Sequence, residues 1–199
     1  MNIIFDVGNV ICEWNPGKIV AQIINDPDRH QEILELIFRH NDWHELDKGS
    51  ITLVEAIANA TARCTLEPEK IAALYNGTPA SLLTMPSMVE TIHDLSSRGF
   101  HLYVLSNMQK HCWEYLTANY NFWTLFTGIV VSYRVNLIKP DPKIFRYILE
   151  KYDLKPANTL YLDDTIENIN AANKFGLNTI HVVNLDDCIS DLYDAVGIE

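Results

Sequence analysis

In the second part of the chain, short apolar runs alternate with longer segments whose apolar residues recur at helical spacing. Alternation of this kind is typical of a parallel sheet with helices on both faces. We therefore predict an α/β fold for this part. Four apolar runs are predicted strands: residues 101–105, 129–132, 159–162 and 178–183.

The segments between these runs are predicted helices. The first follows Pro86, where Ser87-Met88-Val89-Glu90 resembles a capping box, and it stops at Gly99. The segment 142–152 carries its apolar side chains on one helical stripe, which favours packing in a core. Two more helices are predicted at residues 109–120 and 165–175.

One further predicted strand, formed by Ile3, Ile4 and Phe5, lies at the N-terminus and is separated from the other four. Between about residues 15 and 84 no strand pattern occurs. We therefore predict a Rossmann-like parallel sheet core from residues 1–14 and 86–199, with residues 15–85 inserted as a helical bundle. Helical patterns within the insertion lie around residues 18–25, 28–40, 52–64 and 67–75.

Charge and composition narrow the classes of partner. The formal net charge is -11 and Lys and Arg form no run, which argues against nucleic acid. No segment reaches the roughly 18 apolar residues of a membrane span, and the chain does not start with a basic leader. The four cysteines form no C-x-x-C pair, so we expect reduced thiols and a cytoplasmic protein. The sequence leaves the oligomeric state open.

Four predicted strands are followed by polar residues at their carboxyl ends, where parallel sheets bind ligands. These residues are Asp6-Val7-Gly8-Asn9, Ser106-Asn107, Lys139-Pro140 and Asp163-Asp164. Any one of them alone is often a turn or a helix cap. Together, in this order, they describe a site for phosphoryl transfer.

The chemistry of such a site assigns a role to each group. A carboxylate is ionised at neutral pH and attacks phosphorus directly, so Asp6 is the candidate nucleophile. Asp163 and Asp164 would hold Mg²⁺ through hard oxygen ligands and so neutralise the approach of two anions. Lys139 would add a point cation, and Ser106 and Asn107 would bind phosphate oxygens. A small phosphate ester is the expected partner.

The order of these segments resembles the four motifs of haloacid dehalogenase-like hydrolases over the whole chain. The resemblance makes Asp6 the nucleophile and implies that Asp164 ligates the metal directly, with Asp163 and Asn168 close behind it. The inserted helices, residues 15–85, then correspond to a cap that closes over the site and selects the substrate. The start Asp-Val-Gly-Asn-Val is similar to a bacterial branch that includes glucose-1-phosphate phosphatases.

Gly8 is a departure from this family pattern. Most phosphatases of the family have an aspartate there, which ligates the metal through its backbone carbonyl and carries a proton through its side chain. The Gly8 carbonyl remains available to Mg²⁺, but the acid is absent, and such groups typically contribute about 10²–10⁴ in rate. The anomeric oxygen of a sugar 1-phosphate leaves more readily than an ordinary alcohol, so it would need protonation less. A sugar phosphate is therefore the favoured substrate.

Residues of the insertion offer a second source of the missing proton and a sugar pocket. His44, Glu45 or Asp47 could supply the proton, although each is more simply interpreted as part of a solvated helix face. Trp14 and Trp43 could line a sugar pocket, although tryptophans more often pack in cores.

Two other functions compete with the phosphatase. A haloacid dehalogenase would use Asp6 without a metal, but clustered carboxylates without a cation repel one another. A non-catalytic scaffold that binds a phosphorylated ligand or a protein would explain Gly8, but it would have no physical need for the other site residues.

Overall fold

The computed structural model describes residues 1–198 and confirms the parallel α/β sheet. The strand order is β3-β2-β1-β4-β5, and every neighbouring pair is parallel. The predicted strand positions hold, although β2 and β4 end one residue later than predicted and β5 ends two residues earlier. The strands are β1 (Asn2–Phe5), β2 (His101–Ser106), β3 (Gly128–Val131), β4 (Thr159–Asp163) and β5 (Asn178–His181).

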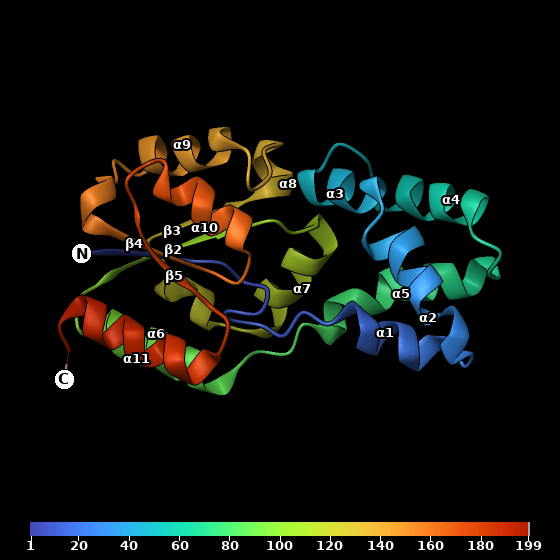
Figure 1. Ribbon diagram of the computed structural model, residues 1–199, viewed down its shortest axis with the longest axis horizontal. Coiled ribbons are helices and arrows are strands. Elements are labelled where there is room, and N and C mark those ends of the chain that lie inside the picture. The colour runs from blue at the N-terminus through green and yellow to red at the C-terminus, as the bar shows by residue number, and fades with distance from the viewer. Residues whose placement is uncertain (199) are drawn as a thin grey trace.

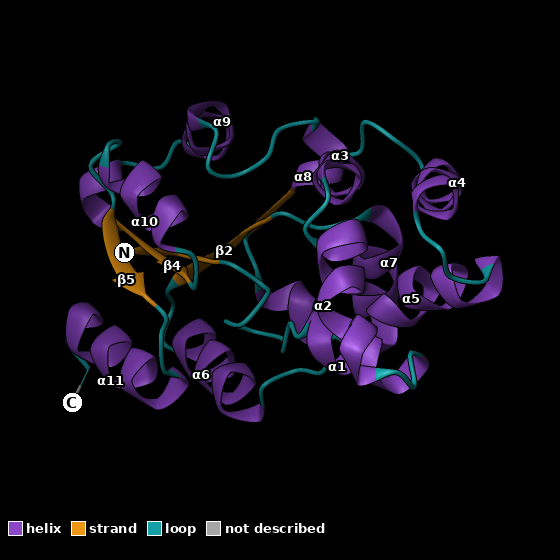
Figure 2. Ribbon diagram, turned by 45° about the vertical axis from the view of Figure 1, so that its right-hand side comes forward, coloured by secondary structure: helices purple, strands orange, loops and turns teal. Residues whose placement is uncertain are grey.

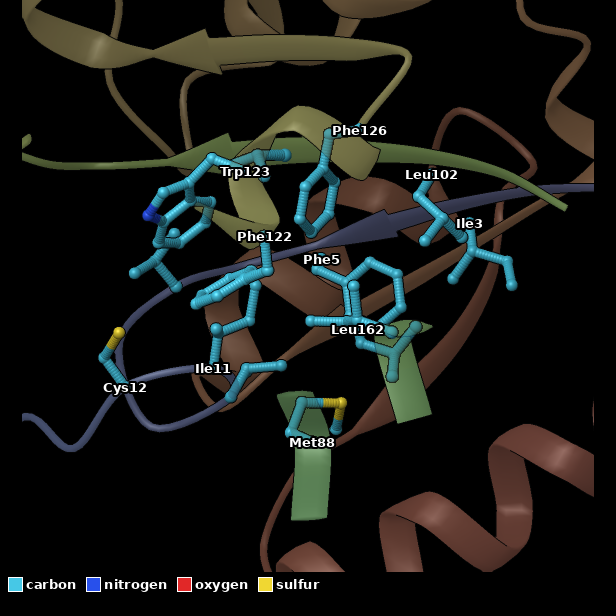
Figure 3. Packing of buried hydrophobic residues seen from close by; sticks show 14 of the residues in the cluster. Ile3, Phe5, Ile11, Cys12, Met88, Leu102, Phe122, Trp123, Phe126 and Leu162 are labelled. Carbon is cyan, nitrogen blue, oxygen red and sulfur yellow. The ribbon is translucent and has the colours of Figure 1, made fainter. Parts of the chain in front are cut away.

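The strands are continuous apolar runs because both faces of the sheet are covered. Ile3 and Phe5 of β1 point into one hydrophobic cluster, and Ile4 between them points into a second cluster on the opposite face. Figure 3 shows the first cluster, where Ile3 and Phe5 pack beside Leu102 and Leu162 of the neighbouring strands. The central position of β1 therefore places the residue after Phe5 in the middle of the sheet edge.

Five helices cover the two faces of the sheet (Figure 1). Helices α6 (Pro86–Ser97), α7 (Lys110–Asn119) and α11 (Leu185–Val196) contribute to the first cluster. Helices α9 (Pro142–Lys151) and α10 (Ile166–Asn173) contribute to the second. The stripe predicted for α9 is confirmed as core, because Ile144, Phe145 and Ile148 are buried. A short helix, α8 (Ser132–Val135), follows β3 directly.

The start of α6 corrects one prediction. Ser87 and Glu90 do not form a capping box, because the helix already begins at Pro86 and Met85 precedes it without a side-chain cap. Proline at the first helical position has the φ that a helix needs, which moves the start one residue earlier. The structure has a capping box elsewhere, between Thr52 and Glu55 at the start of α4.

The insertion is helical, as predicted (Figure 2). It has a hydrophobic cluster of its own. The predicted helix 28–40 is interrupted, because α2 continues into a π-helical segment, Leu34–Phe38. None of the predicted helical patterns covers α3, and α5 extends six residues past the predicted end. The helices are α1 (Pro16–Ile23), α2 (His30–Ile33), α3 (Asn41–Lys48), α4 (Leu53–Arg63) and α5 (Pro68–Ser81). The domain boundaries at 14/15 and 85/86 remain predictions.

The two segments that connect the insertion to the sheet core run side by side. The Glu13 N–H donates to the Leu83 carbonyl at 2.8 Å, and the Met85 N–H donates to the Ile11 carbonyl at 2.8 Å. The insertion thus leaves the core and returns to it at one place.

The C-terminal end of α3 is attached to the core beside α8. Gly49 ends α3 with a φ of +78°, and a Cβ on it would lie 2.6 Å from the Tyr133 carbonyl oxygen. A Cβ at this distance would clash with the backbone, and glycine also adopts the left-handed conformation most readily. Asn136 adds a hydrogen bond from its side chain to the Lys48 carbonyl at 3.1 Å.

Within residues 1–198, no helix is both long and apolar enough to cross a membrane.

Candidate active site

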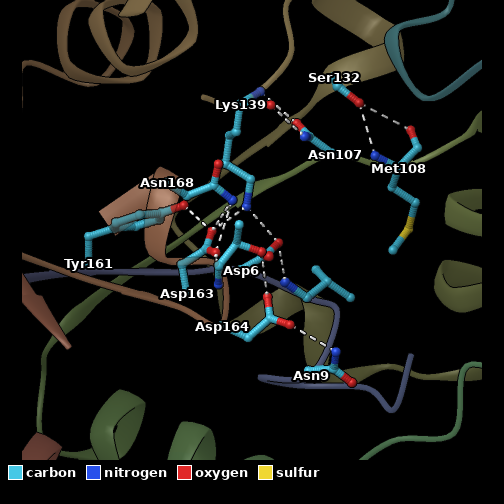
Figure 4. A network of polar contacts seen from close by, with 12 residues as sticks. Asp6, Asn9, Asn107, Met108, Ser132, Lys139, Tyr161, Asp163, Asp164 and Asn168 are labelled. Carbon is cyan, nitrogen blue, oxygen red and sulfur yellow. Dashed lines mark hydrogen bonds and ion pairs between the residues drawn. The ribbon is translucent and has the colours of Figure 1, made fainter. Parts of the chain in front are cut away.

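Lys139 joins two of the predicted site carboxylates at the carboxyl edge of the sheet (Figure 4). Its ammonium lies 2.9 Å from Oδ1 of Asp6 and 2.6 Å from Oδ2 of Asp163. The Lys139 side chain is 1% exposed, so water does not screen these two ion pairs. Asp6 follows β1 and Asp163 ends β4, and the pairing of these strands brings both carboxylates to one ammonium.

Asp163 is surrounded by hydrogen-bond donors besides Lys139. Its Oδ1 accepts from the Thr165 N–H at 2.8 Å and from the Asn168 side chain at 2.9 Å. Its Oδ2 accepts from the Tyr161 hydroxyl and, at 3.1 Å, from Asn168. Both oxygens are occupied, so Asp163 orients Lys139 more readily than it ligates a metal. Tyr161 was not identified from the sequence, because its position in β4 predicts only a core residue.

Asp164, the next residue, has freer oxygens and is oriented by Asn9. The Asn9 side chain donates to Oδ2 of Asp164 at 2.8 Å, and its own oxygen accepts from the Trp14 N–H at 2.9 Å. Asn9 has a φ of +53°, a left-handed conformation that asparagine adopts more readily than most residues. The sequence assigns no role to Asn9. Its place in the polar turn after Asp6 is the one feature that indicates a position near the site.

The site fits a divalent cation. One carboxylate oxygen from each of Asp6, Asp163 and Asp164 lies within 4.8 Å of the others. Three carboxylates and the single ammonium of Lys139 leave two negative charges uncompensated, which matches the charge of Mg²⁺. Carboxylate oxygens are also the hard ligands that Mg²⁺ prefers. Of the three carboxylates, Asp6 and Asp164 accept fewer hydrogen bonds than Asp163 does, so their oxygens are more available to a metal ion.

The electrostatics of Asp6 show the need for that cation. Burial raises the pKa of Asp6 to about 7, and Lys139 lowers it less than burial and the other two carboxylates raise it. For Lys139, burial lowers the pKa, but Asp163 and Asp6 outweigh burial and hold it above its usual value. For Asp163, burial raises the pKa, but Lys139 and the other donors outweigh it and lower the pKa overall. A bound cation would favour the ionised form of Asp6.

Ser106 and Asn107 lie where β2 ends, and both line the same cavity as Asp6. The Asn107 side-chain amide binds the backbone of Lys139: Nδ2 donates to the Lys139 carbonyl at 2.9 Å, and Oδ1 accepts from the Lys139 N–H at 2.8 Å. Asn107 therefore fixes the lysine backbone. Ser106 is 1% exposed.

Gly8 also lines the cavity, two residues after Asp6, the predicted nucleophile. A Cβ at this position would lie 3.5 Å from the Trp14 Cβ, an ordinary van der Waals contact. The backbone therefore does not require glycine here, and the absence of the acid is not explained by a lack of space for Cβ.

The cavity above these residues has a volume of about 350 Å³ and is closed on one side by the inserted helices. Trp14, Phe38 and Trp43 line it, and the Trp14 and Trp43 rings stack with centroids 5.7 Å apart. Trp43 is also core, since it stacks on buried Tyr75 at 5.4 Å. A larger, more open depression of about 650 Å³ lies between α6 and the end of α7, but none of the site carboxylates lines it.

Arg39, Asp47 and Gln109 are polar residues of the cavity wall. The sequence does not single out Arg39 or Gln109. It offers Asp47 as one of three candidate proton donors but favours a solvated helix face for it. That interpretation of Asp47 is wrong, because the residue is partly buried and lines the cavity. Of the other two candidate proton donors, exposed His44 lines the cavity, whereas Glu45 is not among its lining residues.

Comparison with known proteins identifies the family of the chain. The model of the haloacid dehalogenase-like hydrolases matches residues 1–176, so the chain belongs to this family and is a hydrolase. A sesquiterpene phosphatase of Aspergillus oryzae is 26% identical over 98% of this chain and 95% of its own length. A D-ribitol-5-phosphate phosphatase of Bacteroides thetaiotaomicron is 24% identical over 96% of both chains.

A solved structure shows the same fold. It is a haloacid dehalogenase family enzyme of Bacteroides thetaiotaomicron in complex with magnesium and inorganic phosphate, with a TM-score of 0.74 and 21% sequence identity. The match covers 90% of this chain and 92% of that enzyme.

Proposed function

We propose that the chain is a magnesium-dependent phosphatase that hydrolyses a small phosphate monoester through an aspartyl-phosphate on Asp6. The observation that carries this proposal is the buried Lys139 ammonium between Asp6 and Asp163, with Asp164 beside them. This group of charges combines a carboxylate nucleophile with a place for the cation that phosphate chemistry needs.

Each residue of the site has a part in the reaction. Asp6 attacks phosphorus, and water later hydrolyses the aspartyl-phosphate. Lys139 holds Asp6 in place and stabilises negative charge on the transferring group, and the Ser106 hydroxyl and Asn107 bind phosphate oxygens. The metal ligands would be Asp6, the Gly8 carbonyl and Asp164, with Asp163 and Asn168 behind them. Mg²⁺ bound there supplies positive charge that brings the phosphate and the nucleophile together.

A sugar phosphate remains the favoured substrate, and the cytoplasm the proposed compartment. The volume of the cavity limits the substrate to a small molecule. Its stacked Trp14 and Trp43 offer an apolar surface to the carbon skeleton. The two phosphatases that resemble this chain along its length are named for a sugar-alcohol phosphate and for a sesquiterpene, so the panel of substrates should include both kinds.

The test is phosphate release from sugar phosphates, a prenyl phosphate and an aryl phosphate, with Mg²⁺ and with chelator. We expect release that requires Mg²⁺ and that disappears in Asp6→Asn. The matched control is Asp186→Asn, an exposed carboxylate on α11. No phosphate release by folded wild-type protein would overturn the proposal. Halide release from a haloacid without Mg²⁺ would favour the dehalogenase instead.

A further inference from the structure

Helix α3 of the insertion places a carboxyl group in the cavity that Asp6 also lines. Asp47 lies in the last turn of α3 and lines the same cavity as Asp6, which lies on the sheet edge. In an in-line displacement the leaving oxygen lies on the side of phosphorus opposite to the nucleophile. A leaving group attacked by Asp6 is therefore directed toward the inserted helices, where Asp47 lies.

The backbone of Asp47 is held to the core by a buried serine. The Ser132 hydroxyl donates to the Asp47 carbonyl and accepts from the Met108 N–H at 2.9 Å. Ser132 is fully buried. This connection fixes Asp47 relative to the loop after β2, which also carries the predicted phosphate-binding residues. The backbone position of Asp47 is thus set by the core as well as by its own helix.

Gln109, which follows that loop, lines the same cavity as Asp47 and carries a buried side-chain amide. Gln109 is 1% exposed and lines the cavity, and its oxygen lies 3.9 Å from the Cys112 sulfur, a weak donor. Its Nε2 has no hydrogen-bond partner of normal geometry within residues 1–198, yet it is near enough to favour the ionised form of Asp47. A buried amide N–H group without a partner is costly, so it is available to a carboxylate that forms during the reaction.

We propose that Asp47 is the proton donor to the leaving group, in place of the acid that is absent at Gly8. This assignment rests on the proposed phosphatase function. As Asp6 forms its bond to phosphorus and the bond from phosphorus to the leaving oxygen breaks, the proton of the Asp47 carboxyl moves to that oxygen and gives the alcohol. In the second step, Asp47 takes a proton from the water that attacks phosphorus, so phosphate is released and both carboxyl groups return to their starting states.

The electrostatics of the cavity support this role. Burial raises the pKa of Asp47 to about 8; the Gln109 amide lowers it by less, and the Asp6 carboxylate raises it further. A group with this pKa carries the proton near neutral pH and can still release it. The other charged or titratable groups that line the cavity are Asp6, Arg39, His44, Cys112, Lys139 and Asp164.

The test compares Asp47→Asn with wild type on two esters, 4-nitrophenyl phosphate and phenyl phosphate, with Mg²⁺ present. Nitrophenolate leaves readily without a proton, whereas phenolate leaves less readily. We expect kcat/KM to fall by about 10²–10⁴ for phenyl phosphate and by less than about 10 for 4-nitrophenyl phosphate. Activity of the variant on the nitrophenyl ester also shows that it is folded. The control is Glu69→Gln, an exposed cap carboxylate, which should behave as wild type.

The outcomes separate the two proposals. Equal losses on both esters would show that Asp47 only positions other groups, and no loss on either would remove it from the reaction; both results overturn the assignment while the phosphatase stands. A wild-type protein that releases phosphate from neither ester would overturn both proposals together.

Discussion

Asn9 donates a hydrogen bond of 2.8 Å to Asp164, although the two residues are 155 positions apart in the chain. The contact joins the turn after β1 to the end of β4. It therefore holds the loop of the nucleophile and the predicted metal ligand in one arrangement before any ligand binds.

Replacement of Asn9 by glycine should weaken magnesium binding. Glycine keeps the left-handed backbone but removes the amide that orients Asp164. Loss of such a partner typically costs about 10–100-fold in metal affinity, so the Mg²⁺ concentration for half-maximal activity should rise by this factor. Asp153→Gly, at an exposed residue with a φ of +52°, is the matched control. An unchanged Mg²⁺ requirement would show that Asp164 is oriented without Asn9.

Replacement of Asp6 by asparagine should stabilise the metal-free protein at high pH. The folded pKa of Asp6, about 7, is above the ordinary 3.8, so the stability that Asp6 contributes is fully present below about 3.8 and is lost as pH rises through about 7. An asparagine side chain does not titrate, so the variant has no such loss. The variant should exceed wild type by roughly 2–4 kcal/mol in free energy of unfolding at about pH 8, and by little near pH 4.

Denaturant unfolding with chelator at several pH values measures this difference. The opposite shift of Asp163, whose lowered pKa removes stability as pH falls, is present in both proteins and largely cancels. Added Mg²⁺ should reduce the gap, because it binds the folded wild type. If metal-free wild type were the more stable protein at pH 8, the burial cost assigned to Asp6 would be wrong.

The pH dependence of the reaction should differ between leaving groups. Asp47 donates only when protonated, and its raised pKa of about 8 keeps it protonated below that pH. Above about pH 8, kcat/KM for phenyl phosphate should fall by up to about tenfold per pH unit, and less steeply for 4-nitrophenyl phosphate. The ratio of kcat/KM for the two esters cancels the effect of pH on Asp6, because the proposed nucleophile is the same for both. A ratio that is independent of pH in wild type would contradict the prediction.

An aspartate at position 8 should rescue the loss of Asp47. The contact of 3.5 Å between a Cβ at position 8 and Trp14 allows the substitution. In the Asp47→Asn background, Gly8→Asp should restore about 10–100-fold of the activity on phenyl phosphate, within the usual contribution of a general acid. In wild type the same change should add little, because an acid is already present. A large gain in wild type would mean that the natural protein lacks a working acid.

The sheet and the residues at its carboxyl edge could be predicted because they depend on local patterns. Runs such as Ile3-Ile4-Phe5 are apolar on both faces, and the polar residues directly after them must lie at the edge. The predicted residues Asp6, Lys139, Asp163 and Asp164 indeed lie together in the structure. Their individual roles in metal and phosphate binding remain predictions.

The cavity wall could not be predicted, because it depends on contacts between distant helices. Asp47 belongs to a helix that mixes charged and apolar residues, and only the packing of that helix against the core places the residue in the cavity wall. Gln109 is polar yet almost fully buried, and no sequence pattern predicts this burial. The predicted start of a helix was wrong where a neighbouring residue determines it. Pro86, for example, sets the start of α6.

The paired connecting segments, joined by the hydrogen bonds from Glu13 to Leu83 and from Met85 to Ile11, have an evolutionary consequence. Seen from the sheet, everything between these bonds is one long hairpin loop. Such a loop can change in length and sequence while the sheet keeps its shape, since loops tolerate insertions far better than strands do. New substrate ranges can therefore arise through exchange of the cap alone, provided that α3 keeps a residue like Asp47 above the nucleophile.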